Sequence, residues 1–152
     1  MKILVDADSC PKKAMMILIE LAGLYNVPLL AISSFNHQIE GIEKIIVGNE
    51  PQAADMALIN KTSRGDIVVT QDWGLASLVL SKGGNCIAPS GYVYSKEKIA
   101  FMLEERHIKA KVRKGGGRTK GPAPRSKEDD ERFRKNLELL LKQVNFKMKT
   151  EV

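Results

Sequence analysis

Five short apolar runs, separated by stretches suited to helices, constrain the fold of this chain more than any other feature of its sequence. The runs predict strands over residues 2–7, 29–32, 42–47, 67–70 and 86–88. The stretches between and after them predict helices over residues 12–25, 51–61, 75–82 and 96–109. Strands and helices that alternate over short connections favour a parallel sheet with right-handed crossovers. We therefore expect an α/β fold with a mostly parallel sheet of about five strands.

The positive charge of the chain is concentrated near its carboxyl-terminal end. Residues 1–105 contain 9 Lys and Arg against 12 Asp and Glu, a net charge of −3. Residues 106–135 contain 12 against 4, a net charge of +8, and residues 136–152 add +1. This asymmetry suggests that the basic segment holds a polyanionic partner, although a solvated linker would have the same composition.

Composition divides the chain into three parts: an α/β domain over residues 1–110, a basic linker rich in Gly and Pro over 111–125, and a closing helix over 126–147. Ser126 and Asp129 have the spacing of a capping box, which would begin this helix. The helix carries an apolar stripe made of Phe133, Leu137, Leu140, Leu141 and Val144. The stripe must cover either the domain or a second copy of the chain in a homodimer.

The cellular location of the protein is predicted from two features that the sequence does not show, a membrane span and a signal peptide. No apolar run approaches the roughly 18 residues that a membrane span needs, and we expect no membrane partner. The chain starts directly on the first predicted strand and shows no signal peptide, so we expect a cytoplasmic protein. Cys10 and Cys86 have no CxxC partner, and free thiols are the expectation in that compartment.

Four aspartates lie next to the predicted strands and helices, at positions where a functional site would form. Asp6 and Asp8 lie at the carboxyl end of the first strand, and Asp72 lies at the carboxyl end of the fourth. Asp55 lies near the start of the second helix, which leaves the third strand. Sites in open α/β sheets form outside the carboxyl ends of the strands, near the point where strand order reverses. If the first and fourth strands are neighbours, these carboxylates share one crevice.

Clustered carboxylates repel one another, so a site that gathers three of them needs a cation. Oxygen ligands favour Mg²⁺ or Mn²⁺, and the sequence has no His and Cys set at zinc spacing. Such ions can activate a water molecule and neutralise the charge that develops on a phosphodiester. This is the chemical route from the aspartates to a nuclease.

Each residue also has a structural interpretation. Asp8 or Ser9 could cap the first helix, Asp55 could be a first-turn acid, and Asp72 could cap the third helix. Ser9 and Thr70 could instead hydrogen-bond a metal ligand or water. Asn36 and His37 could border the crevice, and Trp73 either stacks on a base or packs at the helix start. Asp66 belongs at the opposite, amino end of the fourth strand, so we exclude it from the site.

Taken together, the motifs resemble the bacterial YaiI/YqxD family over nearly the whole chain, to about Leu141. They are Asp6–Pro11 (DADSCP), Ala54–Asp55, Gly65–Asp72 (GDIVVTQD) and Gly115–Pro122 (GGGRTKGP). Pro89–Tyr92 departs from the pattern, because Ser90 stands where an Arg is expected and Tyr92 where an acidic residue is expected. Any phosphate contact or salt bridge from that Arg is therefore missing.

The family is grouped with PIN-like nucleases, so the resemblance implies a three-layer PIN-like fold. It also implies that Asp6, Asp55 and Asp72 hold Mg²⁺ or Mn²⁺ as catalytic groups, with Asp8 as an additional acid. The basic segment would hold nucleic acid, RNA in preference to DNA, through phosphate contacts. The contact residues that we expect are Arg113, Lys114, Arg118, Lys120 and Arg125.

Three functions remain open at this point. The first is a metal-dependent nuclease, supported by the acidic crevice together with the basic segment. The second is a non-catalytic RNA- or ribosome-associated binding protein, which the basic segment supports equally. The third is a phosphatase of the HAD type, because Asp6-Ala-Asp8 also resembles that family's Asp-x-Asp, with Asp6 as nucleophile. We rank it last, because no Gly-Thr follows Asp8.

Overall fold

The protein is an α/β domain built on one parallel sheet. The computed structural model describes residues 1–34, 42–48, 50, 52–101, 104–105 and 124–150. The sheet has the strand order β3-β2-β1-β4-β5, and every pairing between neighbours is parallel. This confirms the expected fold class. The strands are β1 (Ile3–Asp6), β2 (Leu29–Ser33), β3 (Glu43–Ile46), β4 (Ile67–Val69) and β5 (Asn85–Ile87).

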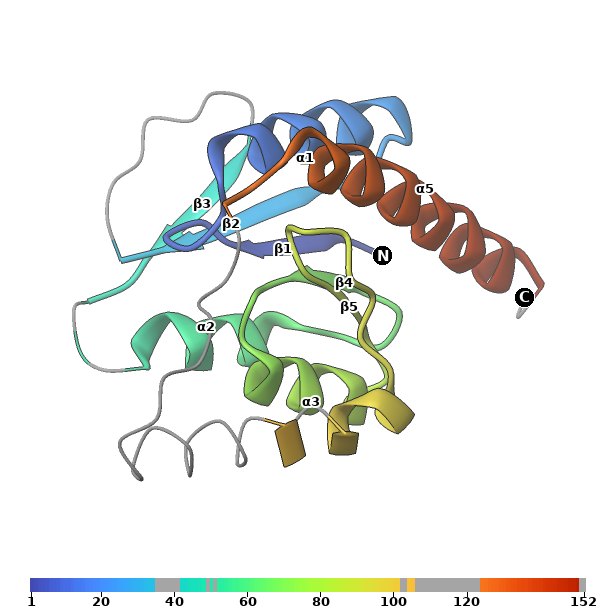
Figure 1. Ribbon diagram of the computed structural model, residues 1–152. Coiled ribbons are helices and arrows are strands. Elements are labelled where there is room, and N and C mark those ends of the chain that lie inside the picture. The colour runs from blue at the N-terminus through green and yellow to red at the C-terminus, as the bar shows by residue number, and fades with distance from the viewer. Residues whose placement is uncertain (35–41, 49, 51, 102–103, 106–123, 151–152) are drawn as a thin grey trace.

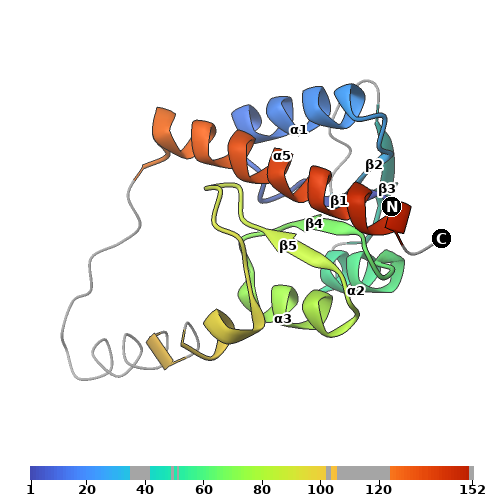
Figure 2. The same cartoon turned by 90° about the vertical axis from the view of Figure 1, so that its right-hand side faces the viewer.

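Helices cover both faces of the sheet, which gives three layers (Figures 1 and 2). Helices α1 (Lys12–Leu24) and α5 (Lys127–Thr150) lie on one face. Helices α2 (Ala53–Lys61) and α3 (Trp73–Ser81) lie on the other. The chain leaves β1 towards β2 and β3, and then returns to β4 and β5 on the other side. Right-handed crossovers in these two directions place their helices on opposite faces.

The central strand β1 shows how the sequence builds both cores. Side chains along a strand point alternately to the two faces of the sheet. Ile3 and Val5 pack in the core beneath α1 and α5, whereas Leu4 packs in the core above α2 and α3. All three side chains are fully buried, so β1 is a continuous apolar run, as is usual for a strand covered on both faces.

Helix α5 packs on the domain of its own chain. The predicted capping box is present: the Ser126 backbone N–H donates to Asp129 at 2.9 Å, and the Asp129 N–H donates back to the Ser126 hydroxyl at 3.3 Å. The apolar stripe of α5 then joins the core beneath α1. Its buried residues are Phe133, Leu137, Leu140, Leu141 and Val144.

The loop after β5 is held against the start of α5. Gly91 has a φ of +95°, and a Cβ there would lie 2.7 Å from the backbone nitrogen of Phe133, so only glycine permits this approach. Three side chains of the α5 region donate to successive carbonyls of the loop: Arg125 to Pro89, Arg132 to Ser90 and Asn136 to Gly91. These contacts fix the loop that borders the carboxyl edge of β5.

Several boundaries and caps differ from those predicted. Helix α1 begins at Lys12 without a side-chain cap, so the prediction that Asp8 or Ser9 caps it is wrong. Helix α3 begins at Trp73, two residues before the predicted start, because Asp72 caps it. Residues 96–101 and 104–105 are helical, and the Ser95 hydroxyl accepts from the Lys98 N–H as expected. The rest of the predicted helix over 96–109 lies outside the described residues.

Two further observations concern expectations drawn from composition. No helix in the described part of the chain is long and apolar enough to cross a membrane. Cys10 and Cys86 are free thiols, as expected, with Cys86 buried in the sheet and Cys10 partly covered. Burial raises the pKa of both thiols, and that of Cys10 rises to about 12.

Candidate functional site

The first and fourth strands are neighbours, as the site hypothesis requires. Strand β1 pairs with β4 in a register that sets Val5 opposite Val69, so Asp6 is level with Thr70. The strand order reverses between these two strands, since β1 continues to β2 on one side and meets β4 on the other. The carboxyl ends of β1 and β4 therefore form the kind of crevice in which open α/β sheets place their sites.

Asp6 occupies this crevice at the end of β1. Its side chain is half-buried, and it accepts a hydrogen bond from the Ser9 hydroxyl at 3.1 Å. Burial is the main cause that raises the pKa of Asp6. The Ser9 hydrogen bond opposes this rise, whereas the negative charges of Asp8 and Asp72 add to it. Asp6 is thus a carboxylate whose charge is incompletely compensated.

Asp55 reaches the same crevice from the first turn of α2. Burial raises the pKa of its carboxyl group, and the charges of Asp72 and then Asp6 raise it further. Asp6, Asp55 and Asp72 come from three different elements and act on one another electrostatically. Predicting this meeting from the sequence required only that β1 and β4 be adjacent and that α2 begin at the same edge.

Asp72 has a structural contact in addition to its place in the crevice. One of its carboxylate oxygens, Oδ1, accepts from the Leu75 N–H at 3.1 Å and caps α3. Its own N–H donates to the Thr70 hydroxyl at 3.1 Å, and Thr70 is almost fully buried. Thr70 therefore orients the backbone of Asp72, while Ser9 contacts Asp6 directly. Both interpretations of Asp72, helix cap and site carboxylate, are compatible with this geometry.

Asp8 is bound to the end of β2. Its carboxylate accepts from the Ser33 hydroxyl at 2.7 Å, and from the N–H and hydroxyl of Ser34 at 2.8 and 2.5 Å. These bonds tie the loop after β1 to the neighbouring strand. The charge of Asp8 still raises the pKa of Asp6, so Asp8 belongs to the electrostatic environment of the site. Its catalytic role stays a prediction.

The carboxylates of Asp6, Asp55 and Asp72 are not gathered around a single point. Among the described residues, no three His, Cys, Asp or Glu side chains lie close enough together to hold one ion. The acids are therefore near enough to repel one another yet lie further apart than ligands that share a cation. A cation that used all three would have to draw Asp6, Asp55 and Asp72 inwards.

Gln71 is a residue of this site that the sequence analysis missed. Its side-chain amide donates to the Ser9 carbonyl at 3.0 Å and so joins the loop after β1 to the loop after β4. No local pattern indicates such a contact, because an exposed Gln between Thr70 and Asp72 looks like an ordinary turn residue. Only the adjacency of β1 and β4 could have suggested it.

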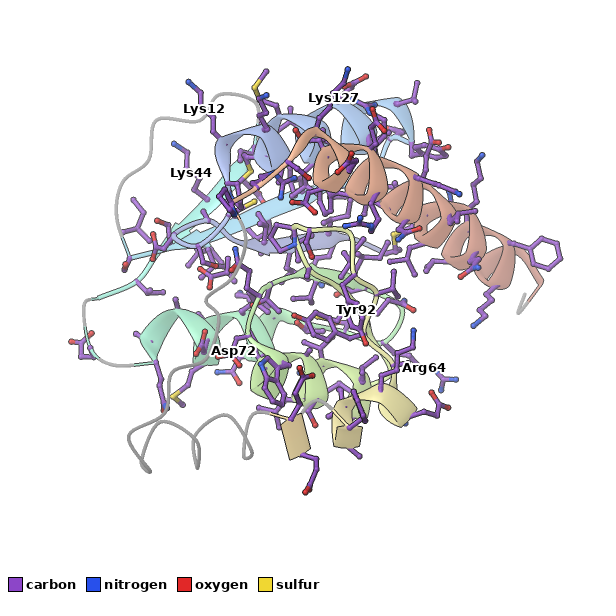
Figure 3. The ribbon with its side chains drawn as sticks, in the orientation of Figure 1. Lys12, Lys44, Arg64, Asp72, Tyr92 and Lys127 are labelled. Atoms are coloured by element: carbon purple, nitrogen blue, oxygen red, sulfur yellow. The ribbon has the colours of Figure 1, made fainter. Side chains whose placement is uncertain are left out.

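A groove opens from the crevice between α2 and α3. Asp55 and Asp72 line one part of it, and the exposed side chains of Met56 and Leu78 line another. Its volume is about 510 Å³. Figure 3 labels Asp72 between these two helices. The two carboxylates therefore face an open groove that a polymer could enter.

Asp66, which the sequence analysis excluded, lies at the opposite edge of the sheet. Its carboxylate accepts from the Lys2 ammonium at 2.6 Å, from the Lys2 N–H at 3.1 Å and from the Ser63 N–H at 2.8 Å. The residue is 2% exposed. These contacts compensate its charge and give it a structural role.

Most of the expected nucleic-acid contacts lie outside the described residues, as do Asn36 and His37. The basic residues concerned are Arg113, Lys114, Arg118 and Lys120. Arg125 is described: its Nε donates to Asp130 at 2.7 Å and its Nη1 to the Pro89 carbonyl at 2.7 Å. Its Nη2 is buried and has no hydrogen-bond partner among the described residues.

Comparison with known proteins gives a family but no reaction. The model of a family described as "Uncharacterized BCR, YaiI/YqxD family" matches residues 4–143. Proteins called "UPF0178 protein" are similar over almost their whole length. One from Heliobacterium modesticaldum is 45% identical over 145 residues, which cover 95% of this chain and 99% of that protein.

Two other relatives give the same result. A "UPF0178 protein" of Alkaliphilus metalliredigens is 42% identical over 93% of this chain and 92% of its own length. One of Clostridium tetani is 43% identical over 93% of this chain and 97% of its own length. No solved structure matches the chain. The names of these relatives state no activity.

Proposed function

The chain belongs to the YaiI/YqxD family, and from the crevice described above we propose that it is a divalent-metal-dependent nuclease that cleaves RNA. The observation that carries the proposal is the gathering of Asp6, Asp55 and Asp72 at one edge, where burial raises the pKa of Asp6 and of Asp55 and neighbouring carboxylates raise it further. Folding tolerates such repulsion at a site that gains a cation.

The donor set fits a hard cation. Asp6, Asp55 and Asp72 offer carboxylate oxygens, which Mg²⁺ and Mn²⁺ prefer, and no imidazole is described in the crevice. When bound, such an ion activates water and stabilises the charge of a phosphodiester undergoing displacement. Asp72 can hold it while still capping α3, because the cap uses Oδ1 and leaves Oδ2 without a hydrogen bond from the described residues.

The chain's own residues prepare the crevice in three ways. Ser9 holds the Asp6 carboxylate, and Thr70 fixes the backbone of Asp72. Gln71 keeps the two loops that carry these acids together. The groove between α2 and α3 leaves Asp55 and Asp72 open to a strand that enters from solvent. A nucleic acid is favoured as the substrate because the basic segment would supply phosphate contacts to a mildly acidic domain, and RNA in preference to DNA is part of the proposal.

The direct test is cleavage of single-stranded and structured RNA by the purified full chain with Mn²⁺. We expect cleavage that a chelator abolishes and that Asp6→Asn reduces at least 100-fold, as loss of a catalytic carboxylate should. Glu20→Gln is the matched control, because it removes one negative charge from α1 at an exposed ion pair with Arg134. It should cleave like the unmodified chain.

Two results would contradict the nuclease proposal. One is cleavage that Asp6→Asn leaves unchanged, which would indicate a contaminating enzyme or another site. The other is the absence of Mn²⁺ binding by calorimetry, since Asp6, Asp55 and Asp72 would then have no cation to share.

A non-catalytic RNA-binding protein is the second candidate, and one observation favours it. No three potential metal ligands lie within reach of one ion in the described residues. Under this alternative the acids bind a cation weakly at best, and the basic segment alone holds RNA. RNA binding that persists in chelator, without cleavage in any divalent metal, would favour this candidate over the nuclease.

A further inference from the structure

A second pocket lies beside the carboxylates, on the side of α5. Its volume is about 620 Å³. It is lined from four parts of the chain: Pro11 before α1, Gln71 and Trp73 around the start of α3, Tyr92 after β5, and Arg125 before α5. Ligand pockets of this kind range from roughly 300 to 1,000 Å³, so this one can take a single nucleotide.

Aromatic side chains form one wall of the pocket. Trp73 is half-buried and packs partly against the core. Tyr92, labelled in Figure 3, meets Tyr94 edge to face, with ring centroids 5.5 Å apart and planes at 78°. The Tyr94 hydroxyl donates to the Thr70 carbonyl, which anchors this pair to the end of β4. The aromatic wall is therefore fixed to the strand that carries Asp72.

Positive charge also lines the pocket. The guanidinium of Arg125 lines the pocket, and its buried Nη2 lacks an acceptor among the described residues. A buried donor without a partner is costly, and an anionic oxygen would supply the missing bond. Because Nη2 is covered, the guanidinium must turn slightly to reach a ligand. Lys98 adds a second positive charge at the aromatic side chains, with its ammonium over the Tyr92 ring, 5.4 Å from the ring centre.

One carboxylate also lines the pocket, but its charge is engaged. Asp129 accepts from the Ser126 N–H and from Arg132 at 3.0 Å, within the capping box of α5. Those contacts lower its pKa and compensate its negative charge. Asp129 therefore opposes an anion less than a free carboxylate would.

The pocket and the carboxylate crevice are adjacent. Gln71 lines the pocket and bonds to the Ser9 carbonyl, while the hydroxyl of the same Ser9 bonds to Asp6. Cys10 is near both, since the Arg125 and the Asp6 charges act on its thiol. A nucleotide in the pocket would thus lie next to a phosphodiester held at the carboxylates.

We propose that this pocket binds one unpaired nucleotide of an RNA strand, with its base against Trp73 and Tyr92 and its phosphate at Arg125. The inference rests on the proposed function for its choice of RNA, and it adds the subsite that holds the nucleotide beside the cleaved bond. An aromatic wall takes any base by stacking, and the Nη2 group of Arg125 is available to donate to the phosphate. The subsite selects single-stranded RNA, because a paired base cannot stack there.

Trp73 is the only tryptophan in the chain, so its fluorescence reports on the pocket directly. The full chain is titrated in chelator with adenosine 5′-monophosphate, with adenosine and with inorganic phosphate. We expect saturable quenching by the nucleotide and binding at least about tenfold weaker for either half of it. A single-stranded hexa-adenylate should bind more tightly than the mononucleotide, and equal or weaker binding would overturn the assignment to an RNA strand.

Arg125→Gln and Arg132→Gln form a matched pair. Each variant loses an ion pair to an aspartate of α5 and a hydrogen bond to a carbonyl of the loop after β5. Only Arg125 lines the pocket. We expect Arg125→Gln to weaken nucleotide binding at least about tenfold, and Arg132→Gln to weaken it clearly less, because Arg132 compensates the charge of Asp129 without lining the pocket. Equal losses in both variants, or no saturable quenching of the unmodified chain, would overturn the proposal.

Tyr92→Ala provides a second test in case Arg125→Gln does not fold. It should weaken nucleotide binding about tenfold, because it removes part of the aromatic wall. Unchanged binding would contradict the subsite. All these titrations contain chelator, so they are independent of metal-dependent cleavage. Cleavage without nucleotide binding would overturn the subsite alone, and nucleotide binding without cleavage would overturn the nuclease alone.

Discussion

Strand β4 separates two aspartates that the same sheet places in opposite environments. Asp66 precedes the strand, is buried, and binds both the ammonium and the N–H of Lys2. Asp72 follows the strand, is exposed, and faces two other carboxylates across the crevice. At the amino edge, groups of the same chain compensate the negative charge of Asp66. At the carboxyl edge, several negatively charged carboxylates lie near one another.

The difference shows how a parallel sheet separates stability from function. The amino edge is held by the chain's own cations and amides, so its acid can be buried at little cost. The carboxyl edge collects the loops of every strand, and acids from β1, α2 and the turn before α3 meet there. Under the nuclease proposal, a bound cation compensates the carboxylates at this edge, as Lys2 compensates Asp66 at the amino edge. The two edges should therefore respond differently to the loss of a carboxylate.

The largest effect is expected at the amino edge, from Asp66→Ala. The variant leaves the Ser63 and Lys2 N–H groups without their acceptor and removes the partner of a partly buried ammonium. We expect it to lower the free energy of unfolding by about 3 kcal/mol, measured by denaturant titration. A loss below about 1 kcal/mol would mean that water replaces these contacts and that the two edges differ less than proposed.

A smaller effect is expected at Asp72, where the helix cap and the charge can be separated. Asp72→Ala removes the acceptor of the Leu75 N–H and should cost about 1 kcal/mol of stability. Asp72→Asn keeps a capping oxygen and should cost much less, while losing Mn²⁺ binding as completely as the Ala variant. Circular dichroism during thermal unfolding, paired with calorimetry, measures both quantities. If the Asp72→Asn variant kept its affinity for Mn²⁺, the negative charge of Asp72 would have no role in metal binding.

The sequence predicted the fold well because short buried strands and caps have strong local signals. Five apolar runs and the Ser126–Asp129 capping box were visible without any knowledge of long-range contacts. The exclusion of Asp66 also followed from strand length alone. The error at α1 has a physical reason: Asp8 and Ser9 have the residue types of helix caps, but Ser33 and Asp6 compete for their side chains.

The site was less accessible to sequence reasoning, because its contacts depend on tertiary structure. The meeting of Asp6 with Asp72 could be stated only conditionally, until the pairing of β1 with β4 was known. The contact of Gln71 with Ser9 spans 62 positions and has no local signature. The pocket at Arg125 needs α5 to return to the loop after β5, which composition cannot indicate. Whether Asp6, Asp55 and Asp72 bind a cation stays a prediction.

The smallest effect, and the sharpest contrast with Asp66, is expected from Asp6→Asn in chelator. Burial and neighbouring charges raise the pKa of Asp6 in the folded chain above its unfolded value. Its ionised form therefore costs folding stability at neutral pH, and this cost disappears as the pH falls through the raised pKa. Asp6→Asn should thus raise the free energy of unfolding near neutral pH, by less than about 1 kcal/mol because the crevice is partly open to solvent.

The pH dependence and the response to metal make this last prediction specific. The advantage of Asp6→Asn should shrink in acid, where the unmodified chain is protonated at Asp6 as well. Saturating Mn²⁺ should reverse the order, because only the unmodified chain gains binding free energy, about 2.7 kcal/mol at 100 times the Kd. Denaturant titrations at several pH values, with and without Mn²⁺, measure both effects. A variant less stable than the unmodified chain in chelator at neutral pH would show that Asp6, like Asp66, is already compensated within the chain.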